Sequence, residues 1–270
     1  MKLNLKNKKT SVILVCVFAA VVLVCAVIFV PSGDINPFGD GAVYSQQTTG
    51  TTVPATVATT QPETTKAKKV SKKTGRIIVN PKQKLWNLVV VNITRQMPSD
   101  YKPELAQIFS TGIYMDKRVV PYYEKMYKAA KKDGVTLTPY SGYRSYDRQK
   151  RNYNSLTQSY MTQYGISKTK AAKKAAKVIL PPGTSEHNLG LAMDICNTLD
   201  SFADTKEYRW LTKNAHKYGF ILRYTEEKTG ITGIVDEPWH WRFVGTEYAE
   251  DIKNSGLCLE EYLEMKGIDY

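Results

Sequence analysis

An uninterrupted apolar run at residues 11–30 divides this chain into parts that cannot share one fold. The run contains no charged residue, and its 20 residues are enough for a helix to cross a bilayer. It is also longer than the ~7–15 apolar residues of a secretory signal, although a cleaved signal peptide is the alternative interpretation. We therefore predict a transmembrane anchor at residues 11–30, preceded by a basic tail at residues 1–10.

The charges on either side of the apolar run predict its orientation. Four lysines precede the run, and no Lys or Arg follows it until Lys66. Under the positive-inside rule, this asymmetry places the amino-terminal tail in the cytoplasm and the rest of the chain outside. We expect a single-pass protein of the cell membrane whose folded domain is extracellular.

Residues 31–75 are rich in Thr, Pro and Gln and carry almost no large apolar side chains. Such a segment cannot bury enough surface to offset the entropy lost on ordering, so we predict a disordered stalk.

The net charge of +13 is concentrated in the first 84 residues, because residues 85–270 hold 26 basic and 22 acidic residues. Eight basic residues without an acid lie between Lys66 and Lys84. This stretch favours contact with anionic wall polymers or lipid, and a merely solvated linker is the alternative. Nucleic acid is not expected as the partner of an exported domain.

Residues 76–270 have a suitable length for one hydrophobic core, and we predict a single domain there. Helical spacing and capping residues predict helices at residues 118–132, 146–164, 168–179 and 204–219 and from residues 246 and 259 onward. Short runs rich in β-branched or aromatic residues predict strands at residues 85–93, 135–140, 189–195, 220–224 and 238–244. The elements show no regular βαβ order, which indicates an α+β fold with a small, largely antiparallel sheet flanked by helices.

Two of the chain's three histidines lie in short motifs that also contain carboxylates. His187 and Asp194 occupy the first motif, and Glu237 and His240 occupy the second. A catalytic zinc ion takes three protein ligands from imidazole, carboxylate and thiolate and keeps the fourth position for water. His187, Asp194 and His240 would supply those ligands, while Glu237 would handle the proton of the water. These residue types therefore point to hydrolysis.

Spacing alone does not separate a metal site from ordinary packing. His187 and Asp194 are seven residues apart, which would place them on opposite faces of an unbroken strand. The chain therefore has to bend between them if both bind one ion, and Gly190 is a residue that permits a bend. His240 lies between two tryptophans, where a packed and hydrogen-bonded histidine is the alternative. The helical His-Glu-x-x-His motif is absent, and we interpret His216, on a predicted helix, as structural.

Two of the four cysteines lie inside the apolar run, which leaves Cys196 and Cys258 in the predicted domain. An oxidising exterior permits a disulfide between them, and two buried thiols are the alternative.

Four motifs, in order along the chain, resemble those of the VanY-type D-alanyl-D-alanine carboxypeptidases of zinc peptidase family M15. They are Ser-Gly-Tyr-Arg-Ser at residues 141–145, Pro-Gly-Thr-Ser-Glu-His through Gly-Leu-Ala-Met-Asp at residues 182–194, Tyr-Gly-Phe-Ile-Leu-Arg-Tyr at residues 218–224, and Glu-Pro-Trp-His-Trp-Arg-Phe-Val-Gly at residues 237–245. The resemblance covers residues 85–263 and implies the Hedgehog/DD-peptidase-like fold of that family.

The resemblance also implies a role for each site residue. The family's three zinc ligands fall on His187, Asp194 and His240. Its general base, which acts on the zinc-bound water, corresponds to Glu237, and the arginine that contacts the substrate near the scissile bond corresponds to Arg144. Gln149 and Ser185 match polar contacts to the substrate.

By this resemblance the chain is a zinc-dependent metallopeptidase that hydrolyses the terminal D-Ala-D-Ala bond of peptidoglycan stem peptides. An L,D-carboxypeptidase or a D,D-dipeptidase acting on the same substrates is the alternative enzyme. A non-catalytic wall-binding module with structural zinc is the alternative from another class. Glu237 beside a set of three ligands favours catalysis, because structural zinc sites normally have four protein ligands.

Overall fold

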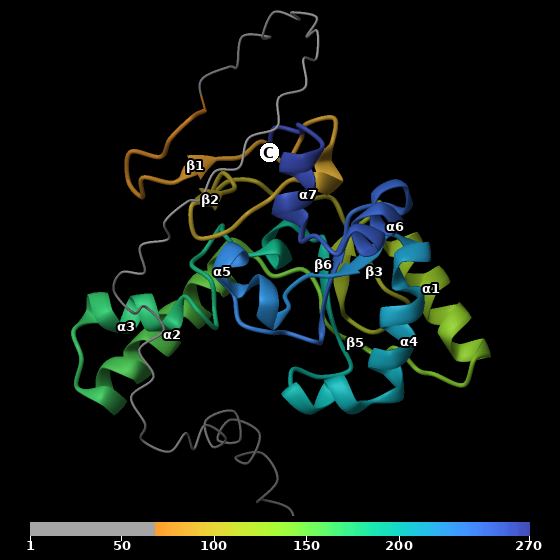
Figure 1. Ribbon diagram of the computed structural model, residues 1–270. Coiled ribbons are helices and arrows are strands. Elements are labelled where there is room, and N and C mark those ends of the chain that lie inside the picture. Colours follow the sequence, from red (N-terminus) through yellow and green to blue (C-terminus); the bar gives the residue numbers. More distant parts are fainter. Residues whose placement is uncertain (1–67) are drawn as a thin grey trace, which may run out of the picture. The chain divides into compact units, whose positions relative to one another are not determined.

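The computed structural model describes residues 68–270, shown in colour in Figure 1. The predicted tail, membrane span and most of the stalk lie outside the described residues and stay predictions. Within residues 68–270, no helix combines the length and the apolar character that crossing a bilayer requires. The described chain starts before the predicted domain boundary at residue 76, and Val70 already forms an antiparallel bridge with Ile77.

A four-stranded antiparallel sheet forms the centre of the fold, in the strand order β5-β6-β8-β7. Its strands are β5 (Pro139–Ser141), β6 (Ala192–Ile195), β7 (Phe220–Leu222) and β8 (His240–Phe243). Every residue of β6 and β8 is buried, so polar side chains on these two strands lie inside the protein. The predicted α+β class with a small antiparallel sheet is confirmed.

Helices and short strands surround this sheet (Figure 1). The helices are α1 (Val120–Lys132), α2 (Tyr146–Tyr164), α3 (Lys168–Ala175), α4 (Lys206–Asn214), α5 (Thr229–Thr232), α6 (Thr246–Ser255) and α7 (Leu259–Met265). Two further pairs of strands, which the sequence did not predict, are β1 (Ile77–Ile78) with β2 (Arg95–Gln96) and β3 (Leu105–Gln107) with β4 (Tyr114–Asp116). Short 3-10 helices connect several of these elements.

Two apolar clusters stabilise the sheet. In the larger one, Tyr123 and Met126 of α1 pack with Trp241 and Phe243 of β8. The smaller one includes Ile221 of β7 and buried side chains of α6 and α7. Because these apolar side chains fix β8 in place, the polar residues His240 and Arg242 on this strand have defined positions.

The predicted strand at residues 85–93 is wrong. This segment contains a 3-10 helix at Trp86–Leu88, residues 89–91 belong to no strand, and Asn92 makes only an isolated bridge with Arg95. Leu88 and Val90 enter the smaller apolar cluster, whereas Val89 enters the larger one. The side chain of Arg242 takes the place of a neighbouring strand, since its Nη2 donates to the carbonyls of Asn87 and Val89.

Most helix predictions are confirmed, with shifted ends. The bounds of α2 and the starts of α6 and α7 are as predicted. Helix α1 begins two residues later than predicted, because Arg118 takes part in a turn that Asp116 caps through its carboxylate. Helix α4 begins at Lys206, two residues later than predicted, and Thr205 caps it by accepting a hydrogen bond from the amide of Tyr208. Helix α3 ends at Ala175, earlier than predicted.

The two cysteines of the described chain are free thiols. Cys258 is buried, and Cys196 is partly buried with its thiol 3.6 Å from the carbonyl of Thr136. The two thiols are therefore separate, as in the alternative of two buried thiols, but only Cys258 is buried.

Candidate functional site

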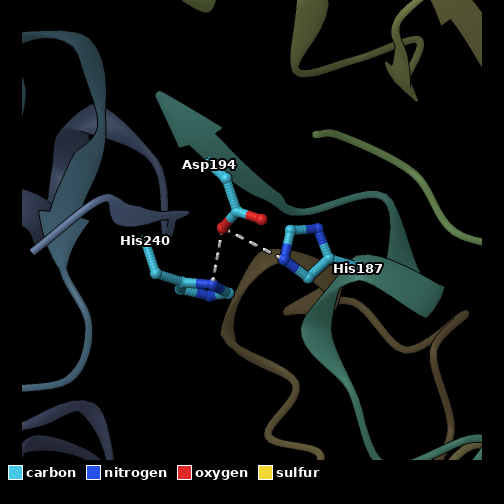
Figure 2. Close-up of side chains that lie close together, drawn as sticks. All are labelled: His187, Asp194 and His240. Carbon is cyan, nitrogen blue, oxygen red and sulfur yellow. Dashed lines mark ion pairs between the residues drawn. The ribbon is translucent and has the colours of Figure 1, made fainter. Parts of the chain in front are cut away.

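The three expected metal ligands come from separate elements that meet beside the central sheet (Figure 2). His187 lies on the 3-10 helix Glu186–Leu189, Asp194 lies on β6, and His240 is the first residue of β8. The antiparallel register of β6 and β8 places Asp194 directly opposite His240. The sheet therefore brings the two sequence motifs together.

Gly190 supplies the bend that lets His187 and Asp194 approach each other. It ends the 3-10 helix with a left-handed φ of 73°, which favours glycine. A Cβ atom at this position would lie 2.8 Å from the backbone nitrogen of Asp116, so a larger residue would also clash. The predicted bend is thus required by both backbone conformation and space.

A single oxygen of Asp194 lies between the two imidazole rings. Its Oδ1 is 3.3 Å from Nε2 of His187 and 3.2 Å from Nδ1 of His240. One ligand atom from each of the three residues lies within 4.8 Å of the others, and all three side chains are buried. The dashed lines in Figure 2 mark these two contacts.

The donor set fits a zinc ion. Although both ring nitrogens are close, Oδ1 of Asp194 has no partner with hydrogen-bonding geometry among the described residues. A buried carboxylate oxygen without a partner is costly, and a cation at this point would satisfy it. Two imidazoles and one carboxylate are also a ligand set that zinc takes in catalytic sites.

The outer nitrogen of each imidazole is held by another group. Nδ1 of His187 is 2.8 Å from the carbonyl of Gly142, which can only accept, so this nitrogen carries the hydrogen. Nε2 of His240 is 3.2 Å from Oε2 of Glu186. Both contacts leave the inner nitrogens, Nε2 of His187 and Nδ1 of His240, facing Asp194. Such outer partners fix the ring orientation of metal-binding histidines.

The surrounding side chains favour positive charge at the centre. Burial raises the pKa of Asp194, but His187 and His240 outweigh it and hold the pKa of this carboxyl well below its usual range. Burial lowers the pKa of His240, yet its contacts with Asp194 and Glu186 raise it to about 9. His187 has a lowered pKa because burial dominates there. The carboxylate is therefore ionised and available to a cation.

Glu237 lies in the turn before β8, with its Oε2 3.6 Å from Nδ1 of His240. Its carboxylate keeps some access to solvent, with 15% of the side chain exposed. Burial raises the pKa of Glu237 to about 7. The negative charge of Asp194 also raises this pKa, whereas His240 and Arg144 lower it. A carboxylate with this pKa can accept and return a proton near neutral pH.

Arg144 lies between β5 and α2, and its guanidinium faces the same centre. Its Nη2 is 4.0 Å from Oδ2 of Asp194. The backbone of Arg144 is fixed because its nitrogen donates to the carbonyl of His187 and its carbonyl accepts from Asn188. The cation is thus held next to the ligands, where an anionic group of a substrate could reach it.

Gln149 and Ser185 lie close to these groups but differ from simple substrate contacts. Gln149 is buried, and both ends of its amide are engaged, since Oε1 accepts from Arg144 and Nε2 donates to the carbonyl of Leu180. Gln149 therefore holds the guanidinium of Arg144. Ser185 is also buried, precedes the 3-10 helix and makes no side-chain cap.

The motifs predicted no role for Glu186 or for Arg223 and Arg242, the two arginines that contact it. Glu186 is fully buried and bonds Arg223 and Arg242 as well as His240. The signal for Glu186 was its position next to His187 within the first motif. Its partners lie on β8 and just after β7, so sequence order alone did not connect them.

Comparisons with known proteins agree with the motifs. The family model described as VanY, D-alanyl-D-alanine carboxypeptidase, matches residues 112–246, a span that contains every site residue discussed above. A D-alanyl-D-alanine carboxypeptidase of Enterococcus faecalis is 42% identical over 181 residues, which cover 67% of each chain.

Two solved structures share the fold. One is a glutamate-to-alanine variant of the vancomycin resistance D,D-pentapeptidase VanY in complex with Zn(II), with a TM-score of 0.58 and 42% identity over 66% of this chain and 99% of that one. The other is the LdcB LD-carboxypeptidase, with a TM-score of 0.62 and 34% identity over 73% of this chain and 94% of that one.

Proposed function

Because the chain belongs to the VanY family of D-alanyl-D-alanine carboxypeptidases, we propose that its buried centre cleaves the terminal D-Ala-D-Ala bond of peptidoglycan stem peptides. The chain is a zinc-dependent metallopeptidase, and His187, Asp194 and His240 would hold the ion. One observation carries this assignment: Oδ1 of Asp194 lies between two inward-facing imidazole nitrogens and has no hydrogen-bond partner within residues 68–270. A solved VanY relative that is in complex with Zn(II) supports it.

Glu237 is the general base in this proposal. A bound zinc ion would polarise the scissile carbonyl and make the attacking water more acidic. Glu237 takes the proton of that water and later gives it to the departing amine of the terminal D-alanine. Its position next to His240 and its pKa of about 7 suit both transfers.

Arg144 binds the free carboxylate at the end of the substrate. Its Nη1 donates to Gln149 and its Nη2 donates to Ser141, which fixes the plane of the guanidinium. The remaining donors can pair with a carboxylate, whose charge and planar shape match the guanidinium. A carboxypeptidase needs such a group because it has to recognise the end of a chain.

The products formed from defined stem peptides test the reaction. The full chain, incubated with tri-, tetra- and pentapeptide stems, is expected to shorten only the pentapeptide, by one D-alanine, as measured by mass spectrometry. A chelator should stop the cleavage and added zinc should restore it. Shortening of the tetrapeptide would instead assign the L,D-carboxypeptidase, the activity named for the LdcB neighbour. Release of a dipeptide would assign a D,D-dipeptidase, and uncleaved stems with retained zinc would assign a binding module.

The same assay separates two roles for Arg144. With Arg144→Ala, we expect kcat/KM for the free pentapeptide to fall by about 10- to 100-fold, the loss of one charge-assisted contact. A pentapeptide that ends in a carboxamide should be cleaved slowly by both proteins, with little further loss in the variant. Arg148→Ala, an exposed arginine nearby on α2, is the matched control. An equal loss on both peptides would mean that Arg144 stabilises the oxyanion instead.

We also propose that the domain acts outside the cell on a membrane anchor, with its basic stretch against anionic wall polymers or lipid. Lys69, Lys72 and Lys73, the part of this stretch next to β1, are exposed. Detergent should release the full chain from a membrane fraction, whereas high salt alone should not. External protease should digest the domain in intact protoplasts. Release by salt alone, or full protection from protease, would contradict this placement.

A further inference from the structure

Glu186 is among the least exposed residues around the site. Its side chain is 0% exposed, and both carboxylate oxygens are engaged. Oε2 lies 3.2 Å from Nε2 of His240, while Oε1 accepts from Nε of Arg223 at 2.8 Å and from Nη1 of Arg242 at 2.7 Å. Glu186 thus connects a metal ligand with two buried guanidinium groups.

Both arginines are themselves fixed. Arg223 makes two parallel hydrogen bonds to Glu260 of α7, at 2.9 and 2.7 Å. Arg242 donates to the backbone carbonyls of Asn87, Val89 and Phe243. Because each guanidinium is tied to another element, the carboxylate of Glu186 cannot swing away from His240.

The charges of this group balance without a contribution from His240. Two carboxylates, Glu186 and Glu260, face two guanidinium groups, Arg223 and Arg242. The carboxylate of Glu186 is therefore balanced by guanidinium groups, and a bound metal ion would take His240 as the neutral imidazole, as a metal ligand must be. Buried ion pairs stabilise a fold no better than well-packed apolar side chains of similar volume, so packing alone does not explain four buried charges here.

We propose that Glu186 is a positioning residue for the metal centre. It accepts the Nε2 hydrogen of His240 and so fixes the ring with the lone pair of Nδ1 directed at Asp194. Arg223 and Arg242 hold the carboxylate, and Glu260 links this arrangement to the C-terminal helix α7. The inference rests on the proposed function, since it assigns Glu186 a task at the same zinc centre.

The arrangement of His240 can be measured without any substitution. The full chain has only three histidines, so protein labelled with ¹⁵N in histidine gives three pairs of ring signals, and His216→Gln identifies one of them. In the zinc-loaded protein, His240 should carry its hydrogen on Nε2 and show metal contact at Nδ1. Metal contact at Nε2 of His240 would overturn the proposal.

Glu186→Gln tests the same claim through metal affinity. The amide oxygen of Gln should turn toward Arg223 and Arg242, which places the NH₂ group against Nε2 of His240 and moves the ring hydrogen to Nδ1. We expect zinc affinity, measured by competition with a chelator, to fall about 10- to 100-fold, the usual cost of losing an outer partner. The ¹⁵N signals of His240 should report the changed tautomer.

Glu260→Gln is the matched control, because it removes one charge from the same ionic group without touching His240, and its amide oxygen still accepts from Arg223. It should lower the melting temperature, as Glu186→Gln does, yet keep zinc affinity near that of the wild type. Equal weakening of zinc by both variants would reduce Glu186 to a structural residue. If Glu186→Gln does not fold, the ¹⁵N experiment on the wild type still shows which ring nitrogen of His240 carries the hydrogen and which one contacts the metal. A wild type that binds no zinc would contradict the proposed function itself, whereas unchanged affinity in Glu186→Gln contradicts only this inference.

Discussion

Replacing Glu237 by Gln is expected to lower kcat about 10³-fold, within the range for the loss of a positioned general base. The amide keeps the size of the side chain but cannot take a proton from the attacking water. The three metal ligands are untouched, so bound zinc should remain near one ion per chain. Turnover of the stem pentapeptide and the zinc content of the same preparation measure the two effects. In a solved VanY relative, a glutamate-to-alanine variant is in complex with Zn(II).

The control for this variant is Glu250→Gln, at an exposed glutamate on α6, which should retain full activity.

The pH profile of the wild type provides a second check on Glu237. A general base works only when it is unprotonated, so activity should fall as the pH drops through the pKa of Glu237. The protein groups raise that pKa to about 7, and the charge of a bound cation lowers it, so the acid limb should lie below pH 7. Turnover in Glu237→Gln close to that of the wild type would remove Glu237 from the mechanism.

Replacing Asp194 by Asn is expected to abolish both activity and tight zinc binding. Asp194 is the anionic member of the ligand set, and its Oδ1 faces both imidazoles. A neutral amide is a poor zinc ligand, so affinity should fall by more than the ~100-fold typical of an outer partner. Equilibrium dialysis measures the affinity, and turnover of the stem pentapeptide measures the activity.

Thermal unfolding gives an independent readout for Asp194→Asn. Zinc that binds only the folded chain stabilises it, by about 4 kcal/mol at a thousandfold excess over the Kd. Added zinc should therefore raise the melting temperature of the wild type but leave that of Asp194→Asn unchanged. Asp133→Asn, which alters a carboxylate bonded to Trp210 away from the site, should respond to zinc like the wild type. A rise in Asp194→Asn equal to that of the wild type would exclude Asp194 as a ligand.

Much of the site could be predicted because each motif is local. His187 and Asp194 share one short segment, and Glu237 and His240 share another. Residue types and family motifs therefore indicated the ligands, the candidate base and the cation of Arg144 before any geometry was known. The long amphipathic helices were also predictable, since α2 follows its sequence pattern over its full length.

Other features could not be predicted because they depend on partners far along the chain. The apolar segment at residues 85–93 has the composition of a strand. Two of its carbonyls nevertheless accept hydrogen bonds from Arg242, more than 150 residues later, instead of from a neighbouring strand. Gln149 matched a substrate contact by motif, but its amide holds Arg144 and the carbonyl of Leu180. The carbonyls of Asn87 and Val89 accept from a side chain more than 150 residues away, whereas the amide of Gln149 bonds a side chain five residues away and a backbone carbonyl 31 residues away.

The sequence by itself determined the chemistry of this protein, namely the family, the kinds of zinc ligand and the candidate base, because residue identity and short spacing are enough to specify them. Only the tertiary structure decided which nitrogen of each imidazole faces the centre. Gly142 lies 45 residues from His187, and Glu186 lies 54 residues from His240. Hydrogen bonds over such separations exist only once the antiparallel pairings of β5 with β6 and of β6 with β8 have formed, because packing of the whole domain, rather than local preference, sets their registers.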